Sequence, residues 1–363
     1  MKILVIHPYS FSEYKGGVER YCKNLEEGFA CHKDIEVLQI NDNYFRFLGE
    51  PLPTIKIFKI LKENKPDIIH LHGPHPFATI TGIFGKILGA KTVLTYYAPL
   101  NPSNSFKRII AGLDQFILRY VFDYITIISE DYRKFIESFF SFQKIKLVPL
   151  LLEEEFLQYT KPKDECRKEI SFKNEKVVLF VGRLDRHHYY KGLDVLIKSV
   201  KFSSVGFKFV IIGDGEKKKF YQDLASKEGI IDKIDFVGEV TEELLRKYYR
   251  AADIFILPST SGSEGFGFVL IEAMSLETPT ITTSIVGSAS LIAKREAGII
   301  IPPNNSKVIY EAIEKLIKDK TLYQTLRKNG RALAEEFQVG KNIDKFLEIY
   351  NELIYSKNYE KHL

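Results

Sequence analysis

Cysteine is scarce in this sequence: the 363 residues contain only Cys22, Cys31 and Cys166. The number is odd, and the spacing forms neither a C-x-x-C pair nor a zinc ribbon, which argues against a disulfide framework and a structural zinc site. Reduced thiols of this kind are typical of the cytosol. We therefore expect a cytoplasmic protein.

Long hydrophobic runs are also missing. No stretch approaches the ~18 consecutive apolar residues of a transmembrane helix, and the apolar run at residues 3–6 is much shorter than a signal-peptide core. The sequence has no repeats or low-complexity tracts, which would indicate a solenoid or disorder. We expect a compact chain that neither is secreted nor spans a membrane.

The charge balance does not indicate a nucleic-acid partner. The 52 basic and 47 acidic residues give a net charge of +5, and the two signs are interspersed. No helix-turn-helix, zinc-finger or RNP signature accompanies them. A sugar nucleotide or an anionic membrane surface would suit the same positive charge, and the sequence leaves the oligomeric state open.

The length predicts two domains, because one hydrophobic core stops growing at roughly 250–300 residues. Short runs rich in Val, Ile and Phe alternate with helical patterns, which is typical of parallel sheets covered on both faces. The runs lie at residues 2–6, 35–40, 67–72, 91–96 and 124–129, and again at 177–182, 207–213, 234–238, 253–258, 278–282 and 298–302. This pattern predicts two doubly wound, Rossmann-like α/β domains.

A charged stretch at 153–176, which contains Pro162, separates the two series and is interpreted as a linker. The expected domains are 1–160 and 161–340. Residues 342–354 have apolar side chains at helical spacing, so the segment 341–363 is expected to form a helix that packs back on the first domain.

The clearest motif is S-E-G-F-G-F at 263–268, which leads into a helix and places Glu264 and Glu272 eight residues apart. Glycines allow the backbone to approach a ligand closely, and a helix N-terminus presents N–H groups to phosphate. Two glutamates alone are more often a solvated pair. A glycosidase would also use paired carboxylates.

A second motif follows the strand at 177–182, where G-R-L is followed by Lys191-Gly192 and eight residues, R-L-D-R-H-H-Y-Y, lie between Gly182 and Lys191. An Arg fork and a Lys ammonium supply fixed positive charge and bind phosphate oxygens well. Arg183 and Lys191 are therefore the candidate cations, although a lone Arg and Lys after a strand are more often only solvated. A glycosidase would leave this pair unexplained.

Together these stretches resemble the retaining glycosyltransferases of family 4, which have the GT-B fold, over nearly the full chain. The E-x7-E segment and the G-R-L…K-G segment carry the resemblance. It implies that Glu264 contacts the donor sugar, that Glu272 contacts the nucleotide ribose, and that Arg183 and Lys191 bind the diphosphate. It also implies a retaining transfer of a hexose from a UDP- or GDP-sugar to a glycan or lipid-linked acceptor, with the acceptor in the first domain and the donor in the second.

The resemblance extends to weaker positions. It implies that a glycine loop after the first strand approaches the donor, that the turn at 213–215 and the segment near Val237 line the donor site, and that the loop at 282–290 lies near it. These further donor-binding candidates are Gly16, Gly17, Gly265, Phe266, Gly267, Gly213 and Val237.

On the acceptor side the candidates are His72 and Tyr97. Tyr97 stands where the family often has a histidine after the fourth strand, and a phenol cannot act as an imidazole does at neutral pH. Residues 106–120 combine Lys107, Arg108 and Arg119 with apolar side chains, so they suit either peripheral membrane contact or packing on the sheet.

No metal or other cofactor is expected, because the chain has no D-x-D motif and cationic side chains can replace a divalent ion. His70, His72 and His75 lack the further ligands of a zinc site, and His187 and His188 are expected to be solvated. A dinucleotide enzyme is disfavoured because Gly213-Asp214-Gly215 has no third glycine. A nucleotide-sugar epimerase and a non-catalytic nucleotide-sugar-binding protein stay open as alternatives.

Overall fold

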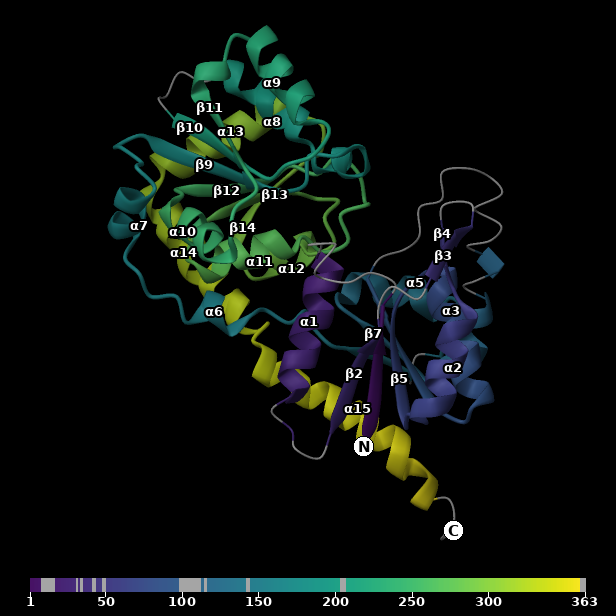
Figure 1. The fold of residues 1–363 in the computed structure, drawn as a ribbon. Helices are drawn as coiled ribbons and strands as arrows, with labels where there is room; N and C mark the ends of the chain where they lie inside the picture. The colour runs from purple at the N-terminus through teal and green to yellow at the C-terminus, as the bar shows by residue number, and fades with distance from the viewer. Residues whose placement is uncertain are drawn as a thin grey trace. The chain divides into compact units, whose positions relative to one another are not determined.

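A computed structural model gives the fold as two compact units, each described by itself below (Figure 1). Unit 1 comprises residues 1–151 and 337–363, and unit 2 comprises residues 152–336. The structure describes residues 1–7, 17–30, 32, 35–40, 44–47, 50–97, 112–113, 116–141, 144–202 and 207–359.

Unit 1 is built on a parallel sheet with the strand order β2-β1-β5-β6-β7-β8. A short antiparallel pair, β3-β4, stands apart from it. The elements are β1 (Lys2–Ile6), α1 (Gly17–Ala30), β2 (Glu36–Ile40), β3 (Tyr44–Phe47), β4 (Glu50–Pro53), α2 (Ile55–Asn64), β5 (Ile68–Gly73), α3 (Pro76–Ile87), β6 (Lys91–Tyr96), β7 (Tyr124–Ile127), η1 (Glu130–Tyr132), α5 (Arg133–Glu137) and β8 (Ile145–Leu147).

The C-terminal helix α15 (Val339–Tyr359) belongs to unit 1 and packs against α1. Gly28 of α1 makes the approach possible, since a Cβ there would lie 2.5 Å from the Ile343 side chain. Farther along α15, the Tyr350 hydroxyl lies 2.6 Å from Nδ1 of buried His70. The prediction that the last helix returns to the first domain is confirmed.

Unit 2 repeats the architecture with a parallel sheet of order β11-β10-β9-β12-β13-β14. The four inner strands are buried on both faces, as their continuous apolar runs predicted, while the edge strands at the two ends of the sheet are partly exposed. The elements are α6 (Glu154–Leu157), α7 (Lys163–Glu169), β9 (Lys176–Val181), η3 (Arg186–Lys191), α8 (Leu193–Ser199), η4 (Val200–Phe202), β10 (Phe207–Ile212), α9 (Lys218–Lys227), η5 (Ile231–Lys233), β11 (Ile234–Gly238), α10 (Glu242–Ala251), β12 (Ile254–Leu257), α11 (Phe268–Ser275), β13 (Thr280–Thr283), α12 (Ala289–Lys294), β14 (Gly298–Ile301), α13 (Ser306–Lys318) and α14 (Lys320–Glu335).

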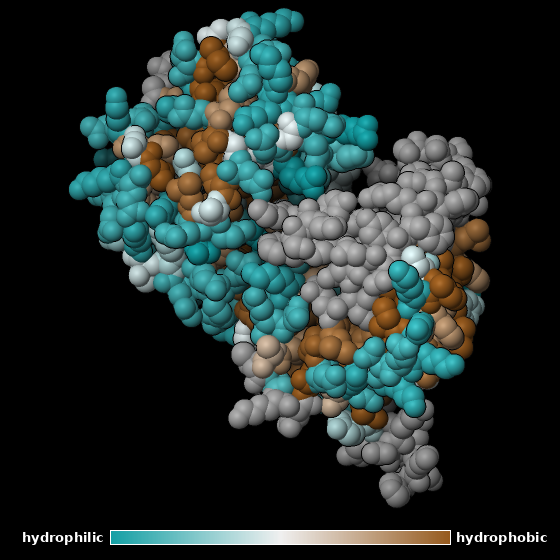
Figure 2. All heavy atoms as spheres, viewed as in Figure 1, coloured by the Kyte–Doolittle hydropathy of each residue, from teal (hydrophilic) through white to brown (hydrophobic). Residues whose placement is uncertain are grey.

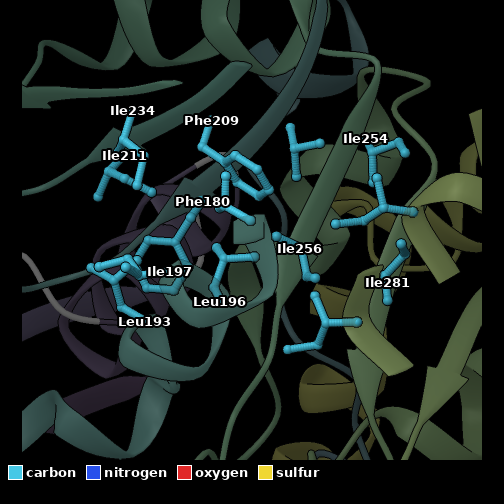
Figure 3. Close-up of a cluster of buried hydrophobic side chains, with 14 of the residues drawn as sticks. Phe180, Leu193, Leu196, Ile197, Phe209, Ile211, Ile234, Ile254, Ile256 and Ile281 are labelled. Carbon is cyan, nitrogen blue, oxygen red and sulfur yellow. The ribbon is translucent and has the colours of Figure 1, made fainter. Parts of the chain in front are cut away.

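One layer of the unit 2 core lies between the sheet and α8, where Phe180 and Ile211 of the strands meet Leu193, Leu196 and Ile197 of the helix (Figure 3). These side chains are almost fully buried. The two units therefore give the GT-B architecture that the resemblance implied, with a hydrophobic core in each.

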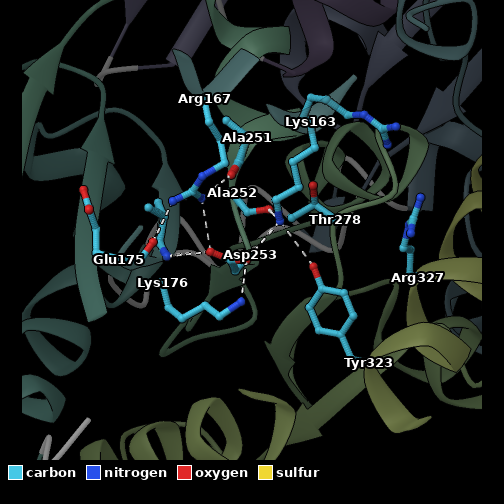
Figure 4. A network of polar contacts seen from close by, with 12 residues as sticks. Lys163, Arg167, Glu175, Lys176, Ala251, Ala252, Asp253, Thr278, Tyr323 and Arg327 are labelled. Carbon is cyan, nitrogen blue, oxygen red and sulfur yellow. Dashed lines mark hydrogen bonds and ion pairs between the residues drawn. The ribbon is translucent and has the colours of Figure 1, made fainter. Parts of the chain in front are cut away.

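The stretch 153–176 is not the linker that its charge suggested. Its helix α7 sends Lys163 and Arg167 to the buried carboxylate of Asp253, at 3.0 and 3.3 Å, and the Val177 N–H donates to the same carboxylate at 2.9 Å (Figure 4). Lys176 approaches it at 3.4 Å. The basic residues that look solvated in the sequence thus neutralise a buried charge inside unit 2.

The division between the units falls at 151/152 and 336/337, before the expected boundaries at 160/161 and 340/341. The reason for the first difference is α6, which packs on α11, while Arg331 donates to the carbonyl of Leu157 at 2.7 Å. Within the described residues no helix is long and apolar enough to cross a membrane. On the visible face of unit 2, hydrophilic residues predominate, with hydrophobic patches between them (Figure 2).

Candidate functional site

The motifs of the second half lie at one edge of the unit 2 sheet. Strands β9, β10, β12 and β13 are parallel, so their carboxyl ends share that edge, and the loops that follow them carry the predicted residues. Ligands of doubly wound sheets bind at this edge. The local fold thus gathers residues from 182 to 288 into one region.

Lys191 and Glu264 form the central contact of this region. The Lys191 Nζ lies 2.6 Å from Oε2 of Glu264, and the two side chains are only 12% and 11% exposed. Gly182 makes room for the lysine stem, because a Cβ at that position would lie 2.8 Å from the Lys191 Cδ. The G-R-L…K-G and E-x7-E motifs, which are separate in sequence, therefore meet through a largely buried ion pair.

The backbone around this pair is packed tightly. The Thr260 N–H and hydroxyl both donate to the carbonyl of Tyr190, at 2.7 and 3.1 Å. Gly192 has a left-handed φ of 74°, and a Cβ on it would lie 2.0 Å from the carbonyl oxygen of Pro258. Only glycine fits both the backbone angle and the space, so the loop after β12 is held against the loop after β9.

Arg183 is bound through Asp185, a residue that the motif reading did not single out. Asp185 Oδ2 lies 2.9 Å from the Arg183 Nε, and its Oδ1 accepts from the backbone N–H groups of His187 and His188 and from Nδ1 of His188 at 2.8 Å. Burial opposes the charge of Asp185, but its contacts with His188 and Arg183 outweigh burial and hold its pKa below the ordinary value. Asp185 thus places an arginine and a histidine on one carboxylate.

His188 is therefore not solvated as expected, because it is bonded to Asp185 and only 26% exposed. His187 is exposed. The signal available in the sequence was Asp185 three residues before His188, the spacing at which an N-terminal Asp accepts hydrogen bonds from the turn that follows.

The stretch 264–268 forms the turn that starts α11. Gly267 has a left-handed φ of 81° and precedes the helix, while Phe266 is buried. The Ser288 hydroxyl donates to the carbonyl of Phe266 at 2.6 Å, and the Gly287 N–H donates to that of Glu264 at 3.4 Å. The loop at 282–290, expected near the donor site, therefore lies against the E-x7-E motif.

Glu272 lies inside α11, 3% exposed, and its Oε2 accepts a hydrogen bond from the Tyr249 hydroxyl at 2.7 Å. Gly213, after β10, lies against the G-R-L…K-G motif. Its φ is 133°, and there is room only for a hydrogen, since a Cβ would lie 2.0 Å from the Gly182 carbonyl oxygen. Val237 is half-buried near the end of the neighbouring strand β11. Gly213 therefore lies against Gly182, and its N–H donates at 2.8 Å to the carbonyl of Gly238, the residue that follows Val237.

In unit 1 the acceptor-side candidates His72 and Tyr97 are in contact. Nδ1 of His72, at the end of β5, lies 2.6 Å from the Tyr97 hydroxyl after β6, and the rings stack. The adjacent His70 bonds to Thr95 through Nε2 at 2.7 Å. Burial lowers the pKa of His70 to about 3 and that of His72 well below its ordinary value, and burial raises the pKa of Tyr97. Both members of the His72–Tyr97 pair are therefore uncharged at neutral pH.

Gly17 is the first residue of α1, and Gly16 lies outside the described residues. His75 caps α3 by accepting from the Ala78 N–H at 3.1 Å, which gives it a structural role. Within the part of the chain that the structure describes, no group of three or more His, Cys, Asp or Glu side chains is arranged to hold a metal ion.

Two parallel-sheet units of this kind are the GT-B architecture, and the family matches identify the class of protein. The model of the group 1 glycosyl transferases matches residues 162–333, and that of glycosyltransferase family 4 matches residues 34–151. Together the two models cover most of the chain. The chain therefore belongs to the family 4, group 1 glycosyltransferases and is a glycosyltransferase.

Particular relatives extend the match over the whole chain. The O-antigen chain mannosyltransferase C of Escherichia coli is 25% identical, and the alignment covers 99% of this chain and all of the relative. Two solved structures share the fold at a TM-score of 0.80. They are the sucrose-phosphate synthase of Thermosynechococcus elongatus (20% identity, 98% and 99% of the two chains) and Anabaena HepE in complex with UDP (18%, 97% and 100%).

Proposed function

We propose that this glycosyltransferase transfers a hexose from a UDP- or GDP-sugar to a sugar or lipid-linked acceptor in glycan synthesis. Unit 2 would hold the donor and unit 1 the acceptor. The names of the relatives support the proposal, since one is an O-antigen mannosyltransferase and a fold neighbour carries UDP. A cytoplasmic location is supported by the free cysteines Cys22 and Cys166, because thiols stay reduced in the cytosol.

The observation that carries the proposal is the buried Lys191–Glu264 pair beside Arg183. A glutamate that binds sugar hydroxyls and a lysine that binds diphosphate must lie within one sugar-phosphate unit of each other, and these two side chains are in direct contact. Arg183 can offer a guanidinium fork to a phosphate because it is 47% exposed. Glu272 would bind the ribose.

In the proposed reaction the bond between the anomeric carbon and the diphosphate oxygen breaks, and its electron pair leaves with the diphosphate. Arg183 and Lys191 stabilise the charge that develops on that oxygen, and no divalent metal is required. The acceptor oxygen attacks the same face of the oxocarbenium-like carbon and gives its proton to the departing phosphate oxygen. The anomeric configuration is retained. An inverted anomer in the first-formed product, detected by proton NMR, would contradict this step.

On the acceptor side, the neutral His72–Tyr97 pair offers hydrogen bonds without charge, which suits hydroxyl groups of a sugar.

A peripheral contact with an anionic membrane is supported by Leu113, Phe116 and Ile117, which are 58%, 52% and 37% exposed, and by Arg119, whose guanidinium lies 4.1 Å from the Phe116 ring centroid. Residues 106–111, 114 and 115 of the same expected segment lie outside the described residues. Liposome sedimentation with anionic lipid tests this contact, and failure to cosediment would remove it.

The proposed donor is tested by a thermal-shift screen over UDP, GDP, ADP and their sugars, followed by incubation with the stabilising sugar nucleotide. A bound ligand raises the melting temperature by mass action. Transfer yields free nucleotide and a glycosylated product. An isomeric donor would indicate an epimerase, stabilisation without turnover would indicate a binding protein, and no stabilisation by any nucleotide would contradict the proposal.

A further inference from the structure

His188 is a partly buried histidine near the candidate diphosphate cations, and its ring is oriented by a carboxylate. It lies in η3, three residues before Lys191, and shares the carboxylate of Asp185 with Arg183. Because a carboxylate can only accept hydrogen bonds, Nδ1 of His188 carries a proton. The neutral ring is therefore the Nδ1–H tautomer, and Nε2 has a lone pair with no hydrogen-bond partner among the residues that the structure describes.

The charges around His188 oppose its protonation while no ligand is bound. Burial, Lys191 and Arg183 lower the pKa of His188, and Asp185 only partly offsets them. Tyr190, whose ring centroid lies 5.8 Å from that of His188, is uncharged because burial and the charge of Glu264 raise its pKa. A diphosphate held by Arg183 and Lys191 would neutralise the two cations and add negative charge beside the ring.

We propose that His188 is a third diphosphate-binding side chain, and that its Nε2 takes up one proton when a nucleotide binds and donates to a phosphate oxygen. The inference rests on the proposed function, because it requires the diphosphate at Arg183 and Lys191. The proton comes from solvent, and no bond to carbon or phosphorus changes. The complex then binds more protons than the unliganded protein, so nucleotide affinity rises as the pH falls, by at most about ten-fold per pH unit for one proton.

The test compares wild type with His188→Asn, whose amide can still donate to Asp185 but cannot titrate. UDP and GDP are each titrated calorimetrically between pH 6 and 8.5, in pairs of buffers with different ionisation enthalpies. We expect wild type to take up a substantial fraction of a proton near pH 7 and to bind more tightly than His188→Asn at pH 6, by up to about ten-fold. The two proteins should bind equally at pH 8.5. Titration of the ligand's own phosphate cancels in this comparison.

His187→Asn is the matched control, because it removes the exposed neighbour and should leave proton uptake at the wild-type value. If His188→Asn keeps the wild-type proton uptake and pH dependence, the inference is wrong while the proposed donor site stands. If neither nucleotide binds wild type, the proposed function fails and the inference falls with it. If a variant does not fold, wild type alone provides the test. The midpoint of the His188 ring titration, followed by NMR, must move to higher pH when nucleotide is present, and an unchanged midpoint overturns the inference.

Discussion

Replacement of Lys191 by methionine is the perturbation whose effect follows most directly from the geometry. The substitution keeps an unbranched side chain that is one atom shorter, removes the ammonium group, and leaves the 9%-exposed Glu264 with an uncompensated charge. Breaking one side of a buried pair costs ~3–5 kcal/mol. Because the pair keeps slight exposure, we expect the lower end, a loss of ~3 kcal/mol in the free energy of unfolding of unit 2. At ~2–4 °C per kcal/mol for a domain of this size, the melting temperature falls by roughly 10 °C.

Glu264→Gln and the double variant complete a thermodynamic cycle. Replacing both partners removes the unpaired charge, so the double variant should lose less stability than the two single variants together, by ~2 kcal/mol. Urea unfolding followed by far-ultraviolet circular dichroism is suitable, because the chain contains no tryptophan. Lys318→Met is the control, since it breaks the solvent-exposed pair with Glu314, and it should change stability little. Additive losses in the cycle would refute the coupling inferred from the 2.6 Å contact.

Three further predictions concern unit 2. Asp253→Asn should lower the free energy of unfolding by ~3 kcal/mol, because it removes the buried carboxylate that neutralises Arg167, only 13% exposed, and Lys163, 31% exposed. The transfer rate per folded molecule should stay unchanged, and a lowered rate in the folded fraction would contradict the purely structural role. Gly192→Ala should lower the free energy of unfolding by at least ~1–2 kcal/mol, because alanine is unfavourable in the left-handed conformation, and the overlap of its Cβ with the Pro258 carbonyl should lower it further. A melting temperature equal to that of wild type would refute the loop packing. Burial opposes ionisation of Glu277, but Arg250 and a second arginine bring its pKa from 4.5 to about 2. The charged carboxylate therefore stabilises the folded state above pH 4.5, and this stabilisation is lost as the pH falls toward 2. Acid unfolding of Glu277→Gln should therefore be less steep over that range than in wild type, and identical curves would disprove the assignment.

The strands could be predicted from the sequence because parallel strands buried on both faces must be continuous apolar runs. The run at 177–182, for example, became β9 with a shift of one residue. Two kinds of element were not predicted from the sequence. The short strand β8, with its exposed Leu147, has too little apolar sequence, and the β3–β4 pair has Pro51 and Pro53, which are unfavourable in strands.

The candidate site was predictable where glycines and charges stand at fixed offsets, as around Lys191 and Glu264. Long-range pairing was not. The role of Lys163 and Arg167 depends on Asp253, which is more than 80 residues away in sequence, so their charges read as a solvated linker. The contact between Asp185 and Arg183 has no spacing signature of its own. The capping contact between Asp185 and His188 did have one, the three-residue spacing, but the motif comparison weighed only the glycines, Arg183 and Lys191, so His188 was expected to be solvated.

The most direct test of the account is a crystal structure of the chain with the nucleoside diphosphate that stabilises it. We expect the diphosphate oxygens to accept hydrogen bonds from Arg183 and Lys191. Glu272 should contact the ribose, and Glu264 should face the position of the sugar. A nucleotide bound at any other edge of unit 2, or bound in unit 1, would contradict it.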